Sequence, residues 1–130
     1  MDERDLQRRT KQFALRVIKL VDALPKTTSG RVIGGQLIRA GTSVAANYRA
    51  ACRGRSKAEF ISKLGNCEEE VDESAFWMEL TIDADLMAAR KVSPLHDEAV
   101  QLTAIMAASR ITASRNRGAI ANRKLQIANP

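Results

Sequence analysis

Apolar residues recur along most of the chain at steps of three, four and seven, which is the spacing of one face of an α-helix. The pattern divides into four segments separated by turn residues and predicts helices over residues 5–24, 31–53, 57–90 and 94–114. No alternating strand pattern and no internal repeat interrupts it. The sequence therefore predicts one all-α domain over residues 1–118, followed by residues 119–130 as a tail or a short docking helix.

The shortest connection joins the second and third segments at Gly54-Arg55-Ser56. Gly54 suits a left-handed residue just after a helix end. Ser56 and Glu59 have the S-x-x-E spacing of a capping box, which begins the next helix. So short a link makes the two helices antiparallel neighbours. An up-down-up-down antiparallel four-helix bundle follows.

The second predicted helix contains glycine at positions 34, 35 and 41. A glycine inside a helix costs up to about 1 kcal/mol relative to alanine. We therefore expect these positions to allow close packing of this helix against its neighbours.

The third predicted helix has a second apolar stripe opposite its core-facing side. This stripe consists of Phe76, Trp77, Leu80 and Met87. A monomer would leave the stripe in water, and exposed apolar patches of this kind mark protein interfaces. The sequence therefore predicts a homo-oligomer with these four residues in its interface.

Composition limits the setting in which the chain works. It has 130 residues and 14.3 kDa, with 45% apolar but only 4% aromatic residues, so the core must be aliphatic. No run approaches the about 20 apolar residues of a membrane span, and the N-terminus lacks the apolar segment of a signal peptide. We expect a cytoplasmic protein with no membrane partner. Cys52 and Cys67 are then expected to be small buried thiols.

The sequence gives no support for an enzyme. Five carboxylates crowd the third predicted helix, at positions 68, 69, 70, 72 and 73, but the only histidine is His96, which is expected at the surface. A di-iron bundle site would need a Glu-x-x-His motif on two helices. We therefore expect no catalytic residues, no metal and no cofactor. Glu68 falls within the core-facing arc, so we expect it to form a structural ion pair with Arg16 or Arg39.

The charge is unevenly distributed. The net charge is +6, yet residues 99–130 contain no acid. Their five basic residues are Arg110, Arg115, Arg117, Arg123 and Lys124. Such a segment, repeated around an oligomer, has the electrostatic character of a surface that binds phosphate backbones. It contains no aromatic residue for base stacking, so binding should have little sequence preference.

Four stretches together resemble the four helix bundle protein family, also called 23S ribosomal RNA intervening-sequence proteins. They are Leu24-Pro25-Lys26, QLIRAGTSVAAN, GRSKAEFISKL and EEEVDESAFWMEL. Several members of that family are encoded within insertions in 23S ribosomal RNA genes. One branch is the accessory variability protein of diversity-generating retroelements, which binds nucleic acid and a reverse transcriptase. Relatives assemble as barrel-shaped homopentamers. The resemblance implies a ring-like homo-oligomer, most simply a pentamer, with RNA or DNA and a nucleic-acid enzyme such as a reverse transcriptase as candidate partners.

Two functions of different classes remain after these steps. The first is a non-enzymatic helical assembly that binds nucleic acid through basic surfaces. The second is a scaffold or adaptor ring that recruits a protein and has no affinity for nucleic acid. Retention of RNA or DNA that weakens as salt rises would distinguish the first from the second.

Overall fold

The computed structural model describes the backbone of residues 1–128 and the side chains of residues 1–116. It consists of α1 (Glu3–Asp22), α2 (Thr28–Cys52), α3 (Lys57–Asp83) and α4 (Ala89–Ala128). No strand occurs in the residues described. The all-α class predicted from the sequence is therefore confirmed.

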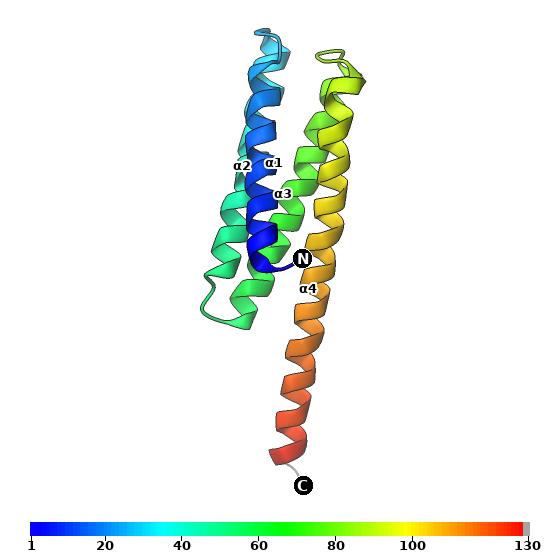
Figure 1. Cartoon of the computed structure of the whole chain (residues 1–130). Coiled ribbons are helices and arrows are strands. Elements are labelled where there is room, and N and C mark those ends of the chain that lie inside the picture. Colours follow the sequence, from blue (N-terminus) through cyan, green and yellow to red (C-terminus); the bar gives the residue numbers. More distant parts are fainter. Residues whose placement is uncertain (129–130) are drawn as a thin grey trace.

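Consecutive helices run in opposite directions and pack side by side (Figure 1). α1 contacts α2, α2 contacts α3, and α3 contacts α4. α4 also contacts α1, but less extensively than the other neighbouring helices contact each other. Figure 1 shows that the C-terminal part of α4 extends well past the ends of the other three helices.

The turn between α2 and α3 confirms the predicted capping box. The Ser56 hydroxyl accepts a hydrogen bond of 3.1 Å from the Glu59 amide, and the Glu59 carboxylate accepts one of 3.1 Å from the Arg55 amide. The left-handed conformation expected for Gly54 is wrong, because no glycine here has a positive φ. Glycine is favoured at position 54 because a larger side chain would be crowded: a Cβ atom there would lie 3.1 Å from the Ala51 carbonyl oxygen.

The boundary between the third and fourth helices differs from the prediction. α3 ends at Asp83 rather than near residue 90, and Asp85 in the following turn has a left-handed φ of 56°. Leu86 and Met87 lie in this turn but pack partly against the core, so they continued the helical apolar spacing and hid the break. α4 begins at Ala89 and contains Pro94.

The end of the fourth helix also differs from the prediction. α4 continues without a break to Ala128. Residues 119–128 therefore extend this helix and form neither a separate tail nor a short extra helix.

The core is mainly aliphatic, as composition required, and also contains the aromatic side chains of Phe13 and Tyr48. Its largest fully buried side chains are Phe13, Leu37, Leu64, Met78, Leu102 and Met106. α2 approaches α1 closely at two glycines, because a Cβ atom at Gly41 would lie 2.8 Å from the Val17 side chain and one at Gly34 would lie 3.2 Å from Val21. Gly35 does not share this role, since nothing lies within 4 Å of its Cβ position.

Candidate interaction surfaces

The basic residues at the C-terminal end have different surroundings. The Arg110 Nε atom donates a hydrogen bond of 2.8 Å to Glu68 of α3, so this guanidinium already has a carboxylate partner. That hydrogen bond and the Glu68 charge raise the pKa of Arg110. Arg115 is exposed. Arg117, Arg123 and Lys124 lie outside the residues whose side chains are described.

Glu68 does form an ion pair, but the expected partners were wrong. Its partner is Arg110 of α4. Arg39 of α2 instead pairs with Glu73 at 2.5 Å and lies 3.7 Å from Glu70. The partner of Glu68 could not be assigned from the sequence, because the choice depends on the register between α3 and α4.

Glu70 lies in a partly dehydrated position between α2 and α3. Its Oε2 atom is buried and accepts no hydrogen bond from the described residues. Burial, followed by the neighbouring Glu73 charge, raises the pKa of Glu70 above its usual range, and Arg39 opposes the shift. The group links two helices, because Arg39 of α2 faces both Glu70 and Glu73 of α3.

The predicted apolar stripe is only partly a single surface. Phe76 is exposed, and its ring meets the Trp77 ring edge to face at 5.0 Å between centroids. Trp77 is half-buried and its indole N–H donates a hydrogen bond of 3.2 Å to Glu73, while Leu80 is half-buried. Met87 does not belong to the stripe, because α3 ends at Asp83 and the helical spacing no longer applies.

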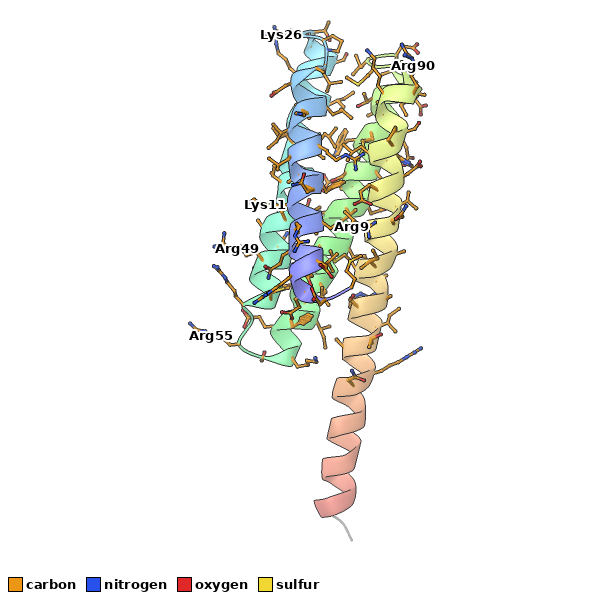
Figure 2. All side chains as sticks on the ribbon, in the orientation of Figure 1. Arg9, Lys11, Lys26, Arg49, Arg55 and Arg90 are labelled. Carbon is orange, nitrogen blue, oxygen red and sulfur yellow. The ribbon has the colours of Figure 1, made fainter. Side chains whose placement is uncertain are left out.

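A basic groove that was not predicted from the sequence lies between α1 and α2. It has a volume of about 410 Å³ and a small-residue lining from Ala45 and Ala46. The polar residues that line it are Gln7, Lys11, Arg49 and Arg53. In Figure 2, Lys11 and Arg49 lie on this side of the molecule, with Arg55 near the turn below them. A sequence signal was present, since residues 23–58 contain no acid.

A second groove of about 550 Å³ opens between α1 and the beginning of α4. Leu20, Leu86, Met87 and Leu95 contribute apolar side chains to it, and the cations in its lining are Arg16, Lys19 and Lys91. Met87 and Arg16 both line this groove. Met87 is therefore not part of the predicted stripe, and Arg16 is not the ion-pair partner of Glu68. The groove lies between α1 and α4, the neighbouring helices that contact each other least.

The histidine and the two cysteines form no candidate catalytic or metal site among the described residues. The His96 Nε2 atom lies 2.8 Å from a Glu79 carboxylate oxygen, so His96 links α3 to α4 rather than standing alone in solvent. Cys67 is buried, Cys52 is half-buried and neither forms a disulfide. Among the described residues, no three His, Cys, Asp or Glu side chains are grouped as metal ligands would be. None of the described helical segments combines the length and apolar character that crossing a membrane requires.

Comparison with known proteins identifies the family. The model of the 23S rRNA-intervening sequence protein family matches residues 3–108. The chain belongs to this family. The match spans all of α1, α2 and α3 and ends within α4, before the C-terminal extension.

One solved structure has the same fold over most of its length. It is the crystal structure of a protein of unknown function from the S23 ribosomal protein family of Bacteroides thetaiotaomicron. The two chains are 25% identical, with a TM-score of 0.79, and the aligned region covers 85% of this chain and 98% of the other. No curated protein matches the chain. Neither the family nor this neighbour is described by an enzymatic activity.

Proposed function

We propose that the chain is a non-enzymatic, oligomeric helical protein that binds RNA or DNA through the C-terminal extension of α4. One observation carries the proposal. α4 continues to Ala128, past the ends of the other helices (Figure 1), and residues 99–130 supply five basic residues and no acid. A projecting cationic helix is accessible to a phosphate backbone and releases counterions when it binds one.

Assembly strengthens this binding. We propose a ring-like homo-oligomer, a pentamer as the family resemblance implies, in which the extensions of several copies combine into one cationic surface. Linked sites raise avidity without any new contact. The solution mass measured by light scattering during size exclusion tests the assembly, and a particle of 14.3 kDa at micromolar concentration contradicts it.

The test of nucleic-acid binding is a salt series. Fluorescence anisotropy with single-stranded RNA and DNA of unrelated sequences should show affinity for each that falls steeply as salt rises. Replacing Arg115, Arg117 and Arg123 by glutamine should weaken binding to every sequence and reduce the salt slope by up to about 2 per subunit, since each cation contributes about 0.7 on a single strand. Arg110 is left unchanged, because its pairing with Glu68 would mix binding with stability.

A matched control removes the same charge elsewhere. Lys26, Arg31 and Arg90 are exposed, and glutamine at these three positions lowers the net charge equally. In Figure 2, Lys26 and Arg90 lie at the end of the molecule opposite the extension. If the control loses as much affinity as the α4 variant, net charge is responsible and the extension is not the site.

A second candidate function follows from the groove between α1 and α4. Its apolar residues and three cations suit an acidic amphipathic segment of another protein, as an adaptor ring would require. If wild-type protein binds neither RNA nor DNA at about 50 mM salt, where non-specific contacts are strong, the scaffold function replaces the first proposal.

A further inference from the structure

The order of the helices creates two opposite edges. The backbone of α1 lies beside those of α2 and α4, and among the described residues no Cα atom of α1 comes within 8 Å of α3, nor any of α2 within 8 Å of α4. The outer surface over α1 and α2 therefore faces away from the outer surface over α3 and α4. We call these surfaces the α1/α2 edge and the α3/α4 edge.

The α1/α2 edge is basic. Its groove is lined by Lys11, Arg49 and Arg53, and α2 contains no acid at all. Leu15, one helical turn after Lys11 on α1, is 47% exposed. The edge thus combines several positive charges with an apolar side chain and the small residues Ala45 and Ala46.

The α3/α4 edge is acidic. α3 contains eight acidic residues against the two basic residues Lys57 and Lys63. Several of these acids are paired within the chain, but Glu69 and Asp72 are exposed and no ion pair involves them among the described residues. Negative charge therefore remains available at this edge.

The α3/α4 edge is also apolar. Two cross-helix contacts, Glu79 with His96 and Glu68 with Arg110, fix the register of the antiparallel pair and bring Phe76 level with Val100. Phe76 is 51% exposed and Val100 is 53% exposed. Ile111 lies farther along the same side of α4 and is 41% exposed. The edge therefore presents two exposed apolar side chains at the same level, together with unpaired carboxylates.

We propose that the α1/α2 edge of one copy binds the α3/α4 edge of the next copy. The proposal rests on the oligomer proposed above and assigns its contact. Opposite charges attract across such a contact, whereas two α1/α2 edges or two α3/α4 edges would repel each other. A contact between two different surfaces is heterologous, and successive copies close into a ring when the rotation between them permits.

A second copy accounts for both edges better than nucleic acid does. A phosphate backbone would satisfy the basic groove but would leave Phe76 and Val100 in water. The groove lining also contains no aromatic residue on which a base could stack. Docking of two edges covers Leu15 on one side and Phe76 and Val100 on the other in a single contact.

Charge exchange between the edges tests the contact. The first variant carries Arg49→Glu and Arg53→Glu, which makes both edges acidic. The second carries Glu69→Lys and Asp72→Lys, which replaces the two unpaired carboxylates of the α3/α4 edge by cations that would face the basic edge of the next copy. Each variant alone should shift from the wild-type oligomer to a mass of 14.3 kDa. A third variant with all four substitutions should regain the wild-type mass. The first two variants should also associate when they are mixed, but the mixture should not regain the mass of a pentamer, because two alternating variants cannot close a ring with an odd number of copies.

The control is Lys26→Glu with Arg90→Glu, which changes the charge as much as the first variant but leaves both edges intact. It should keep the wild-type mass. Circular dichroism of every variant reports whether the helices form. The four-substitution variant keeps the test decisive, because restored assembly shows that each pair of substitutions leaves the fold able to associate.

The outcomes separate this inference from the proposed oligomer. A wild-type protein of 14.3 kDa overturns both. A wild-type oligomer that neither pair of substitutions dissociates overturns only the assigned contact. If Arg49→Glu with Arg53→Glu abolishes binding of RNA or DNA while the mass stays at the wild-type value, the groove binds a phosphate backbone and the proposed contact is wrong.

Discussion

Arg9 of α1 and Glu98 of α4 meet through two nearly parallel hydrogen bonds, from Nε to Oε2 at 2.8 Å and from Nη2 to Oε1 at 2.6 Å. The Arg9 Nη2 atom also donates a hydrogen bond of 2.8 Å to Gln101. Only 24% of the Arg9 side chain and 17% of the Glu98 side chain are exposed, so water screens the pair weakly. Since α1 and α4 contact each other least among neighbouring helices, this pair has an important share in closing the bundle.

Replacement of Glu98 by alanine should therefore lower the free energy of unfolding by about 1.5–3 kcal/mol, the usual range for charged hydrogen bonds whose partner remains partly buried. Arg9→Lys keeps the charge and should lower the free energy of unfolding by a smaller amount, because an ammonium group cannot form both bonds of the planar guanidinium. Urea denaturation of the two single variants and the double variant measures the coupling. A coupling energy near zero would mean that the pair is only a surface contact.

The two glycines Gly41 and Gly35 of α2 provide a matched test of helix packing. Gly41→Ala should destabilise the protein, because the new methyl group would lie 2.8 Å from the Val17 side chain, and overpacking costs about 1–3 kcal/mol. Gly35→Ala should stabilise it by about 0.5–1 kcal/mol, since the site is open and alanine favours a helix. Thermal melts followed by circular dichroism compare the two. Equal shifts in the same direction would show that close packing does not decide these positions.

Asp85 should be replaceable by glycine with a gain in stability. Its φ of 56° lies in the left-handed region, which costs about 1–2 kcal/mol for an ordinary side chain and less for aspartate. We expect Asp85→Gly to raise the free energy of unfolding by up to about 1 kcal/mol and Asp85→Val to lower it. Ala84→Gly, one residue earlier at a negative φ, is the control and should give no gain. A loss on Asp85→Gly would show that the carboxylate has a stabilising role in the turn.

The sequence predicted those parts of the fold that depend on local spacing. The Ser56 and Glu59 capping box needs only neighbouring residues and is where the sequence indicates. The first helix ends at Asp22, two residues before the predicted end at Leu24. The end of α3 at Asp83 was missed, because Leu86 and Met87 in the turn keep the helical spacing of apolar residues.

The candidate surfaces were less predictable, since they depend on which residues of different helices lie opposite each other. Glu68 was correctly placed in an ion pair, but its partner Arg110 lies on α4, and the register of that contact is set by the whole α3–α4 interface. The basic groove brings Lys11 together with Arg49 and Arg53 across two antiparallel helices. The residue spacing of one helix does not tell which residues of the next helix lie beside it, so the groove could not be predicted. The sequence does show that residues 23–58 contain no acid.

Cysteine reactivity should differ between the two thiols. Burial raises the pKa of the Cys67 thiol to about 12, with the neighbouring Cys52 adding to the shift, so Cys67 stays protonated and unreactive near neutral pH. Cys52 is half-buried and reaches the groove beside Gly54 and Ser56. A thiol reagent at pH 8 should therefore label Cys52 in the folded protein, and should label Cys67 only at the rate of unfolding. Mass spectrometry of peptides that contain each cysteine measures the two rates, with urea-unfolded protein as the control for equal labelling.

The same thiol should make the protein less stable at high pH. In the unfolded chain Cys67 loses its proton near its ordinary pKa of 9.0, whereas in the folded chain it holds the proton up to about pH 12. Between these values the unfolded state binds fewer protons, so the free energy of unfolding falls as pH rises. The contribution is fully present below pH 9 and is lost through the interval up to about 12. Burial also raises the pKa of Tyr48, which adds to the fall in the same direction.

Urea denaturation at pH 8 and pH 10.5 measures this decrease in the free energy of unfolding. Cys67→Ala should be less stable than the wild type at both pH values, because it leaves a small cavity. The decrease between the two pH values should nevertheless be smaller in this variant. An equal decrease in the variant would assign the alkaline sensitivity to Tyr48 or to other groups instead of Cys67.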